Sequence, residues 1–478
     1  MTGTSSESIR KWGNVSLILA LLTGVVFLGG LVSAPFPAVS AANLAQFPLE
    51  GHQRILILAP HCDDETLGSA GIILAARRAG IEVQVVIATN GDGYYFATAQ
   101  DFHKIYPHAE DYIRMGGLRQ QESLSALALL GVLSSQVYFL SYPDRGSPSM
   151  WNDNWPAGNP YRSHFTGENK SQYPLTYDPQ DVYAGEDYLG DIASILKNYR
   201  PDLIIYPNPE DVHPDHWGLN AFARLAITQA EHDDTVYRPD QYTYLVHRPD
   251  FPVVRGLKPQ EDLVPPPAVY AISPNWLRWD LIPADVILKG LAVQAYKSQL
   301  PLLRGLMESF VRRNELFAPV SPADLVNAAA GDPRDPYTWR DASDQIISPI
   351  QLDPAHDTIT RDAAPGADLT AIYAARSGET LWACGEVRDY VERGLVYMVR
   401  LKALTEGGLV QYQAQSGEAQ AGWQTASAFR KYFCTQVKLT DLGNPWAIYI
   451  GVESQGLEKT VVDQSAWQMI YVDASSKP

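Results

Sequence analysis

The chain has 478 residues, of which 46% are hydrophobic and 19% are charged, and this ordinary globular composition and length favour two domains. Its formal net charge of -17 argues against a nucleic-acid or anionic-membrane partner, because both bind basic patches on proteins.

Residues 1–45 predict a signal peptide or an N-terminal membrane anchor. Arg10 and Lys11 precede an uncharged stretch, Val15 to Ala34, which is followed by prolines and small residues. The stretch is about as long as a membrane-spanning helix, so both cleavage and retention as an anchor fit it. Positive charge before it predicts that the rest of the chain lies outside the cytoplasm, secreted or anchored. Membrane contact is expected through this segment alone.

Residues 46–335 alternate short apolar runs with helical stretches. The expected strands are Arg54–Ala59, Glu82–Ala88, Val137–Leu140 and Asp202–Tyr206, and the expected helices are Thr66–Ala79, Leu118–Leu130, Tyr188–Tyr199 and Trp217–Ala230. Such alternation predicts an α/β domain with a mostly parallel sheet and helices on both faces. A helical segment over 283–317 is expected to close the domain. Ligands of such sheets bind beyond the carboxyl ends of the strands.

Residues 147–187 are rich in Trp, Tyr, Asn, Pro and Gly and show no periodicity, which predicts a long loop over the site. A linker rich in Pro, Asp and Ala is expected over 322–353. Short strand-like runs then predict a smaller all-β, sandwich-like accessory domain over 345–478. Its Trp423, Trp446 and Trp467 favour core positions over glycan binding.

Three cysteines are present. Cys384 and Cys434 lie in the predicted accessory domain and could form a disulfide, but sequence spacing alone leaves this open. Cys62 lies inside the first cluster of polar residues, described next.

Two clusters of histidines and acids follow apolar strands. His61 and Asp64 lie three residues apart where a strand gives way to a helix, so both side chains can point to one place above the sheet edge. His216 follows the later strand and completes a set of two histidines and one carboxylate. This set suits a single catalytic Zn²⁺ with open positions, and it also occurs in non-haem Fe²⁺ sites.

The remaining polar residues of the clusters have roles that can be predicted beside such a metal. Asp63 is not used as a ligand and is well placed as a general base. His213 can act as a cation or hydrogen-bond donor to a developing oxyanion. Asp215 can orient an imidazole, and Glu65 is expected to be an acid of the first helical turn and not a ligand.

Several motifs occur together in one order along the chain: PHCDDE, ATNGDG, RQQESLSALALLGV, YFLSYPDRG, HPDH, AYKSQ and RRNELF. Over Arg54 to Phe317 the chain thereby resembles the PIG-L (LmbE-like) family of zinc-dependent deacetylases. The resemblance implies a Rossmann-like fold and removal of acetyl groups from N-acetylated amino sugars and related amides.

Carried over by motif, the resemblance assigns a role to each matching residue. It makes His61, Asp64 and His216 the zinc ligands, Asp63 the general base, and His213 the oxyanion stabiliser or acid. It also implies that Arg119, Asp144 and Asp92 lie near the bound sugar, although a salt bridge or a turn cap would equally explain Asp92. The family usually has proline where this chain has Cys62, and alternation at the strand end predicts a buried, inert thiol turned away from the metal.

The sequence therefore predicts a zinc-dependent hydrolase that removes acetyl from an N-acetylated amino sugar or glycoconjugate outside the cytoplasm. The alternative is a surface glycan-binding protein with a degenerate or differently directed amidase site. Nucleotide binding is disfavoured because no glycine-rich loop follows the first strand. The exact substrate and the oligomeric state are left open by the sequence.

Overall fold

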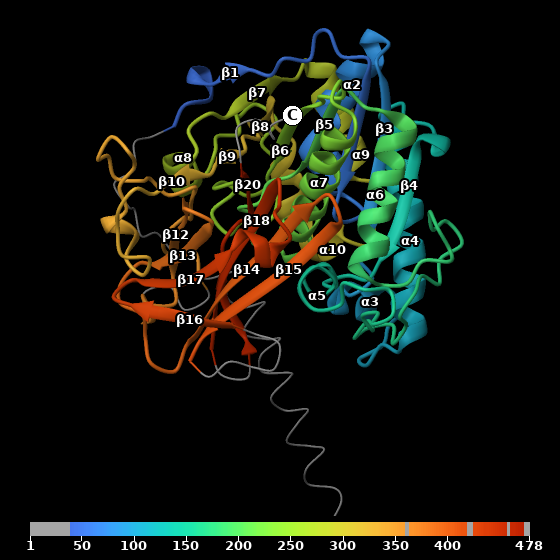
Figure 1. Ribbon diagram of the computed structural model, residues 1–478. Coiled ribbons are helices and arrows are strands. Elements are labelled where there is room, and N and C mark those ends of the chain that lie inside the picture. The colour runs from blue at the N-terminus through green and yellow to red at the C-terminus, as the bar shows by residue number, and fades with distance from the viewer. Residues whose placement is uncertain (1–38, 359–362, 418–423, 457–458, 473–478) are drawn as a thin grey trace, which may run out of the picture.

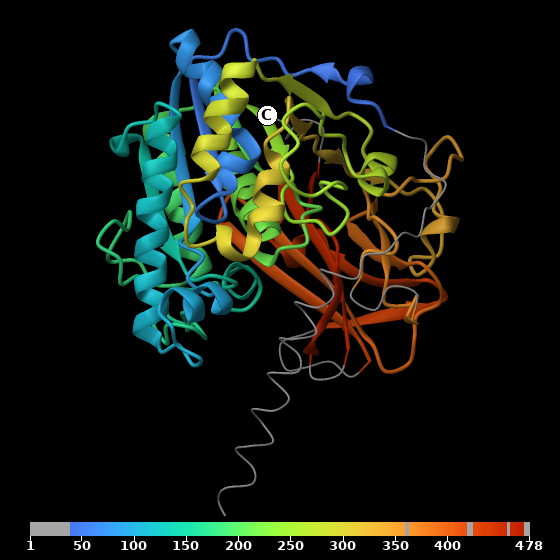
Figure 2. The same ribbon diagram turned by 180° about the vertical axis from the view of Figure 1, so that it is seen from behind.

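The computed structural model describes residues 39–358, 363–417, 424–456 and 459–472, which form the two packed units of Figures 1 and 2. The predicted signal peptide or anchor lies almost entirely outside these residues. Within the described ranges, no helix has both the length and the apolar character needed to cross a membrane.

The N-terminal unit is built on an eight-stranded sheet in the order β1-β7-β8-β6-β5-β2-β3-β4. Its strands are β1 (Ala45–Gln46), β2 (Arg54–Ala59), β3 (Glu82–Thr89), β4 (Val137–Tyr142), β5 (Leu203–Pro207), β6 (Asp240–Tyr244), β7 (Leu277–Asp280) and β8 (Asn314–Pro319). The central strands β6, β5, β2, β3 and β4 are parallel, whereas β8 is antiparallel to both β6 and β7. The predicted mostly parallel α/β sheet is thus confirmed.

Helices cover both faces of this sheet. They are α2 (Asp64–Ala79), α3 (Tyr95–Asp101), α4 (Ala109–Leu129), α5 (Ser147–Asn152), α6 (Gly185–Tyr199), α7 (Pro214–Asp233), α8 (Pro267–Ile272), α9 (Pro283–Val293) and α10 (Leu300–Met307). Along β2, Ile55 and Ile57 enter one core with α2, α4 and α9, while Leu56 and Leu58 enter the other with α6 and α7. Burial on both faces explains why the strand is an unbroken apolar run.

The prediction of closing helices over 283–317 is wrong at its C-terminal end. α9 and α10 are helical, but Asn314 begins strand β8, which inserts between β6 and β7. All residues from Asn314 to Ala318 are buried. The two polar ones are paired: the Asn314 side chain bonds the backbone of Leu263, and Glu315 accepts hydrogen bonds from Lys289 Nζ and two backbone amides of α2. Tertiary partners therefore override the local helical pattern.

The C-terminal unit is all-β and barrel-like, as Figure 1 shows in orange and red. The strands found in the described residues are β9 (Ala323–Asp324), β10 (Val326–Asn327), β11 (Gln351–Leu352), β12 (Leu369–Ser377), β13 (Thr380–Val387), β14 (Val396–Thr405), β15 (Gly408–Ser416), β16 (Gln424–Phe429), β17 (Tyr432–Lys438), β18 (Ala447–Gln455), β19 (Val461–Gln464) and β20 (Gln468–Tyr471). Cys384 of β13 and Cys434 of β17 form a disulfide between neighbouring strands.

The segment expected to be a linker is partly ordered onto this second sheet. Strand β9 pairs with β20, and both β10 and β11 pair with β12. Chain from residue 323 onward therefore contributes strands to the C-terminal sheet, and the residues around Asp353 are held against it.

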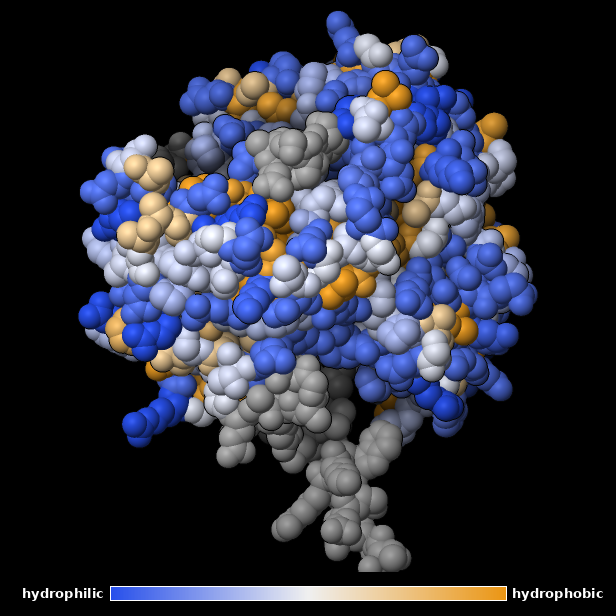
Figure 3. Space-filling view, viewed as in Figure 1, coloured by the Kyte–Doolittle hydropathy of each residue, from blue (hydrophilic) through white to orange (hydrophobic). Residues whose placement is uncertain are grey.

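Aromatic side chains of the 147–187 segment join the two units. Trp151 and Trp155 pack in one buried cluster with Trp467, and Lys402 Nζ of β14 lies 3.8 Å from the ring centroid of Trp155. Trp467 is thus a core residue, Trp446 is partly buried with its ring stacked on His232, and Trp423 lies outside the described residues. Hydrophilic residues dominate the face shown in Figure 3, with apolar ones scattered among them.

Candidate metal centre

The first cluster lies where β2 passes into α2, at the carboxyl edge of the parallel strands. His61 follows the strand, Asp63 is the N-cap position of α2, and Asp64 is the first residue of the helix. The second cluster occupies the same edge, since His213 is the N-cap of α7, which follows β5, the neighbour of β2. Parallel pairing thus brings together groups about 150 residues apart in sequence.

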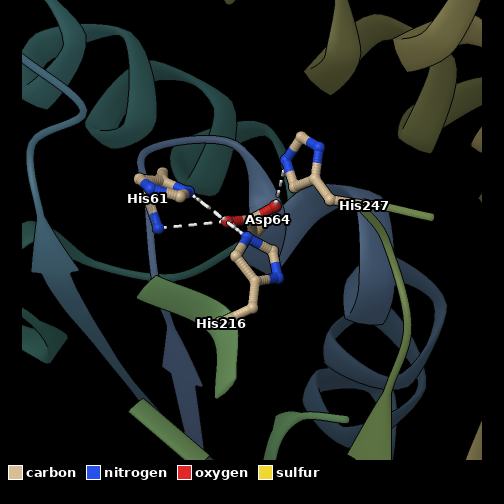
Figure 4. Close-up of side chains that lie close together, drawn as sticks. All are labelled: His61, Asp64, His216 and His247. Carbon is tan, nitrogen blue, oxygen red and sulfur yellow. Dashed lines mark hydrogen bonds and ion pairs between the residues drawn. The ribbon is translucent and has the colours of Figure 1, made fainter. Parts of the chain in front are cut away.

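His61, Asp64 and His216 converge around one carboxylate oxygen (Figure 4). Asp64 Oδ2 lies 3.1 Å from both His61 Nδ1 and His216 Nε2, and these two nitrogens lie 3.3 Å apart. All three side chains are buried. The structure therefore places the three predicted ligands in one cluster.

His247 is a fourth member of this cluster that the sequence reasoning missed. Its Nε2 lies 3.6 Å from Asp64 Oδ1, on the other oxygen of the carboxylate. Potential ligand atoms of His61, Asp64, His216 and His247 all lie within 4.8 Å of one another. His247 follows β6, the next strand beside β5. The sequence signal for His247 is its position shortly after a parallel strand, as for His61 and His216. This signal was not used because strand β6 was not predicted.

The cluster fits a divalent metal because one oxygen of its buried carboxylate lacks a hydrogen bond. Asp64 Oδ1 is buried and makes no hydrogen bond within the described part of the chain, and a bare buried carboxylate oxygen is costly unless a cation meets it. Two or three imidazoles with one carboxylate are ligands suited to Zn²⁺ and related metals.

A second group lies on the other side of the His61 ring. It consists of His61, Asp144, His213 and Asp215. Asp215 Oδ2 lies 3.3 Å from His61 Nε2, the contact expected of an orienting acid. However, Asp215 already accepts the backbone N–H groups of Arg145 and Ser147. Its oxygens are used by the protein, so the Asp64 group fits a metal better.

Asp211 orients the ligands from behind and was not identified from the sequence. Its Oδ2 lies 2.9 Å from His216 Nδ1 and accepts the backbone N–H of His247 at 2.8 Å. Its Oδ1 accepts the backbone N–H of His213 at 3.0 Å. One buried carboxylate thus lies against Nδ1 of His216, which leaves Nε2 toward the cluster, and it holds the loop that carries His247.

Asp63, the predicted base, adopts an unusual backbone conformation with a φ of 146°, a region that favours glycine and that other residues enter at a cost. Its backbone N–H donates to Glu65 Oε2, and its Oδ2 accepts from Arg119 Nη2 at 3.1 Å. Burial raises the pKa of Asp63 to about 7, with Arg119 opposing and Asp64 reinforcing this shift. Such a carboxylate is suited to proton transfer near neutral pH.

His213 is half-buried and its ring lies edge-on to His61, with 4.5 Å between the ring centroids. Burial lowers the pKa of His213 well below its usual value, and the neighbouring histidines add to this. Nδ1 accepts the backbone N–H of Asp215, so the neutral ring carries its proton on Nε2. His213 is thus arranged as a neutral hydrogen-bond donor.

The residues predicted to contact the sugar are mostly engaged with the protein. Arg119 is 5% exposed and donates to the carbonyls of Gly91 and Cys62 as well as to Asp63. Arg119 therefore holds the Asp63 carboxylate in place through a hydrogen bond. The carboxylate of Asp92 accepts from Tyr173 Oη and from the backbone of Asp144, and burial, with the nearby Asp144 charge, raises its pKa to about 7.

Asp144 lies closer to the metal cluster than Asp92 does. Its Oδ1 is 3.7 Å from His61 Nε2, and its Oδ2 accepts the backbone N–H of Gly93 at 2.9 Å. Oδ1 makes no hydrogen bond within the described residues, which leaves it available to a ligand.

Cys62 and Glu65 occupy supporting positions. The Cys62 side chain is fully buried in the core beneath the site, and burial raises the pKa of its thiol far above the usual range, so it is turned into the core and held as the neutral thiol. Glu65 accepts from Tyr296 Oη at 2.6 Å. Tyr296 belongs to the AYKSQ motif, which is therefore explained as a brace for the first turn of α2.

The fold and the site define an α/β domain with a metal-ligand set at the carboxyl edge of its parallel strands. Residues 56–227 match the sequence model of the PIG-L family, described as GlcNAc-PI de-N-acetylase. Residues 56–227 of the N-terminal unit thus match the PIG-L family, which confirms the resemblance predicted from the motifs.

Individual relatives share this domain. A 1D-myo-inositol 2-acetamido-2-deoxy-alpha-D-glucopyranoside deacetylase of Mycobacterium sp. is 30% identical over 181 residues, which cover 37% of this chain and 51% of that protein. The corresponding protein of Tsukamurella paurometabola is 27% identical over 180 residues, covering 37% and 56%. The chain thus spans about half the length of the curated relatives it matches. The structure of an N,N'-diacetylchitobiose deacetylase from Pyrococcus horikoshii aligns at 18% identity with a TM-score of 0.36, covering 67% of this chain and 94% of that one.

Proposed function

We propose that this protein is a zinc-dependent N-deacetylase that hydrolyses the acetamide of an N-acetylated amino sugar or glycoconjugate. The observation that carries the proposal is the buried base Asp63 directly beside the cluster of His61, Asp64 and His216. It is supported by the match to the PIG-L family and by the similarity to the mycobacterial protein named as a deacetylase of a 2-acetamido-2-deoxy sugar.

In this proposal His61, Asp64 and His216 hold the metal, with His247 facing the free oxygen of Asp64. A bound divalent metal supplies Lewis-acid polarisation of the amide carbonyl and lowers the pKa of water to about 7. Asp211 and Asp215 keep the imidazoles in the orientation that binding requires.

The proton steps fall to two residues of this chain. Asp63 takes a proton from the attacking water, and Arg119 holds its carboxylate in place. His213 donates its Nε2 hydrogen to the oxygen that becomes negative as the tetrahedral centre forms. Asp63, now protonated, then gives this proton to the leaving amine, so that acetate and a free amino group result.

The test is acetate release by purified full-length protein from a panel of N-acetylated sugars, polymers and peptides. Asp63→Asn is expected to reduce turnover by about 10²- to 10⁴-fold while metal content stays near one ion per chain, and Asp63→Glu, which keeps a base, should retain part of the activity. Unchanged turnover in Asp63→Asn would disprove the mechanism. Binding of a polysaccharide by wild type with no acetate released would instead favour the glycan-binding alternative.

Metal identity is tested separately by chelation and add-back. Zn²⁺ is expected to restore acetate release most effectively after chelation. Better recovery with Fe²⁺ or Co²⁺ would replace zinc in the proposal and leave the roles of the side chains unchanged.

We further propose that both units lie outside the cytoplasm. The predicted signal or anchor over residues 1–45 and the disulfide between Cys384 and Cys434 support this location, since disulfides persist mainly in oxidising compartments. Protease added to spheroplasts of an expressing bacterium should degrade the protein while a cytoplasmic marker survives. Protection of both proteins would refute the location.

A further inference from the structure

A second cluster of acids lies away from the candidate metal centre, where the segment after β11 meets strand β19. It contains Asp353, Asp357 and Asp463. One oxygen of each carboxylate can be chosen so that all three lie within 4.8 Å of one another. The first two residues lie in the segment between β11 and β12, and the third belongs to β19.

The Asp353 side chain is an independent sign that a ligand is missing from this cluster. It is only 6% exposed, and within the described residues no group hydrogen-bonds to its carboxylate. Oδ1 of Asp357 is likewise buried without a hydrogen bond from the described chain. Buried carboxylate oxygens without donors are strongly disfavoured, so a cation or protons must meet them.

Among the described residues, nearby positive charge does not balance the cluster. Arg248 Nη1 reaches Asp357 Oδ2 at 3.4 Å, but the same guanidinium also pairs with Asp250 at 3.0 Å. Arg388 is paired with a further buried acid, Asp368. Burial and the neighbouring carboxylates raise the pKa values of Asp353, Asp357 and Asp463, which is the response expected when negative charge is in excess.

We propose that Asp353, Asp357 and Asp463 form a Ca²⁺ site that fastens the segment between β11 and β12 to strand β19. The donors are all carboxylate oxygens, which suit a hard cation and do not suit zinc. Ca²⁺ binds oxygen at about 2.3–2.6 Å, so oxygens on opposite sides of it lie about 4.6–5.2 Å apart, and three carboxylates with oxygens within 4.8 Å of one another can share one ion. Mg²⁺ demands a near-ideal octahedron and usually keeps several waters, so it suits a set of carboxylates from separate loop and strand segments less well.

The Ca²⁺ site is also connected to the candidate metal centre. Arg248, which contacts Asp357, directly follows His247 in sequence and donates through Nη1 to the backbone carbonyl of Glu210 at 2.8 Å. Glu210 precedes Asp211, which orients His216. Binding of Ca²⁺ therefore stabilises the loops of the N-terminal unit that position His216 and His247.

The experiment measures Ca²⁺ binding to zinc-loaded full-length protein by calorimetry, together with the Tm. Wild type is expected to bind one Ca²⁺ per chain and to gain a few degrees in Tm in millimolar CaCl₂, with a smaller gain in MgCl₂. Asp353→Asn removes charge without removing a hydrogen bond from the described residues, and it should abolish both the binding and the gain in Tm. Asp441→Asn, an exposed acid of the same unit, is the matched control and should behave as wild type.

Three results would overturn the proposal: no Ca²⁺ bound by wild type, full Ca²⁺ binding by Asp353→Asn, or an equal shift in Tm with Mg²⁺. If Asp353→Asn fails to fold, Asp357→Asn replaces it, since an asparagine oxygen can still accept from Arg248 Nη1, which lies 3.4 Å from Asp357 Oδ2, while Oδ1 makes no hydrogen bond within the described residues. The readouts are Ca²⁺ binding and Tm of the zinc-loaded protein. A negative result would therefore overturn the Ca²⁺ site and would not count against the proposed deacetylase activity.

Discussion

Replacement of Asp211 by asparagine tests whether this buried acid, 3% exposed, prepares His216 to bind metal. Oδ2 of Asp211 serves His216 Nδ1 and the backbone amides of Val246 and His247, whereas Oδ1 serves only the amide of His213. The introduced asparagine should therefore keep its oxygen toward His216 and turn its NH₂ group toward His213. The backbone N–H of His213 then has no acceptor, which lowers the free energy of unfolding by about 1–3 kcal/mol.

Loss of the negative charge has a separate effect on metal affinity. Outer carboxylates that hold a ligating histidine typically contribute 10- to 100-fold in affinity, which corresponds to about 1.4–2.8 kcal/mol. We expect the zinc Kd of Asp211→Asn, measured by competition with a chromophoric chelator at pH 7, to rise by that factor. Asp202→Asn is the matched control, since Asp202 accepts backbone amides of Gln53 and Arg54 with no histidine involved. A Kd within twofold of wild type would refute the reasoning.

Three further predictions concern the base, a buried ion pair and the disulfide. Asp63 acts only when deprotonated, so activity falls as the pH drops through its pKa. Arg119 lowers that pKa, so Arg119→Met should move the acid limb of the kcat/KM profile to higher pH. Arg119→Lys keeps a positive charge and should move the acid limb less. Lys289 and Glu315 are fully buried with 2.7 Å between Nζ and Oε1, so Glu315→Gln should cost about 3–5 kcal/mol in denaturant unfolding; a cost below 1 kcal/mol would contradict this. Cys384 and Cys434 close a loop with a sequence separation of 50, and the chain-entropy relation gives about 4 kcal/mol for it; the double serine variant should lose stability of that order, and an unchanged Tm would refute the estimate.

Local sequence determined the chemistry of the first cluster. His61, Asp63 and Asp64 lie within one turn at a strand-to-helix junction, so their mutual geometry follows from the backbone of that junction. The apolar run of β2 likewise indicated a strand buried on both faces, which the two cores confirm. The motif HPDH supplied His213 and His216 for the same reason, since a helix N-terminus presents its first residues toward the sheet edge.

Tertiary structure alone decided which distant residues join these groups. His247 reaches the centre because β6 pairs beside β5, and Arg119 contacts Asp63 because α4 packs its side chain inward. The strand β8, predicted as helix, is likewise held by partners from α2, α9 and the loop at Leu263. Asp353, Asp357 and Asp463 meet only when the segment between β11 and β12 packs beside β19. Such contacts depend on register and packing over a hundred residues or more, whereas local sequence specifies conformation over only a few turns.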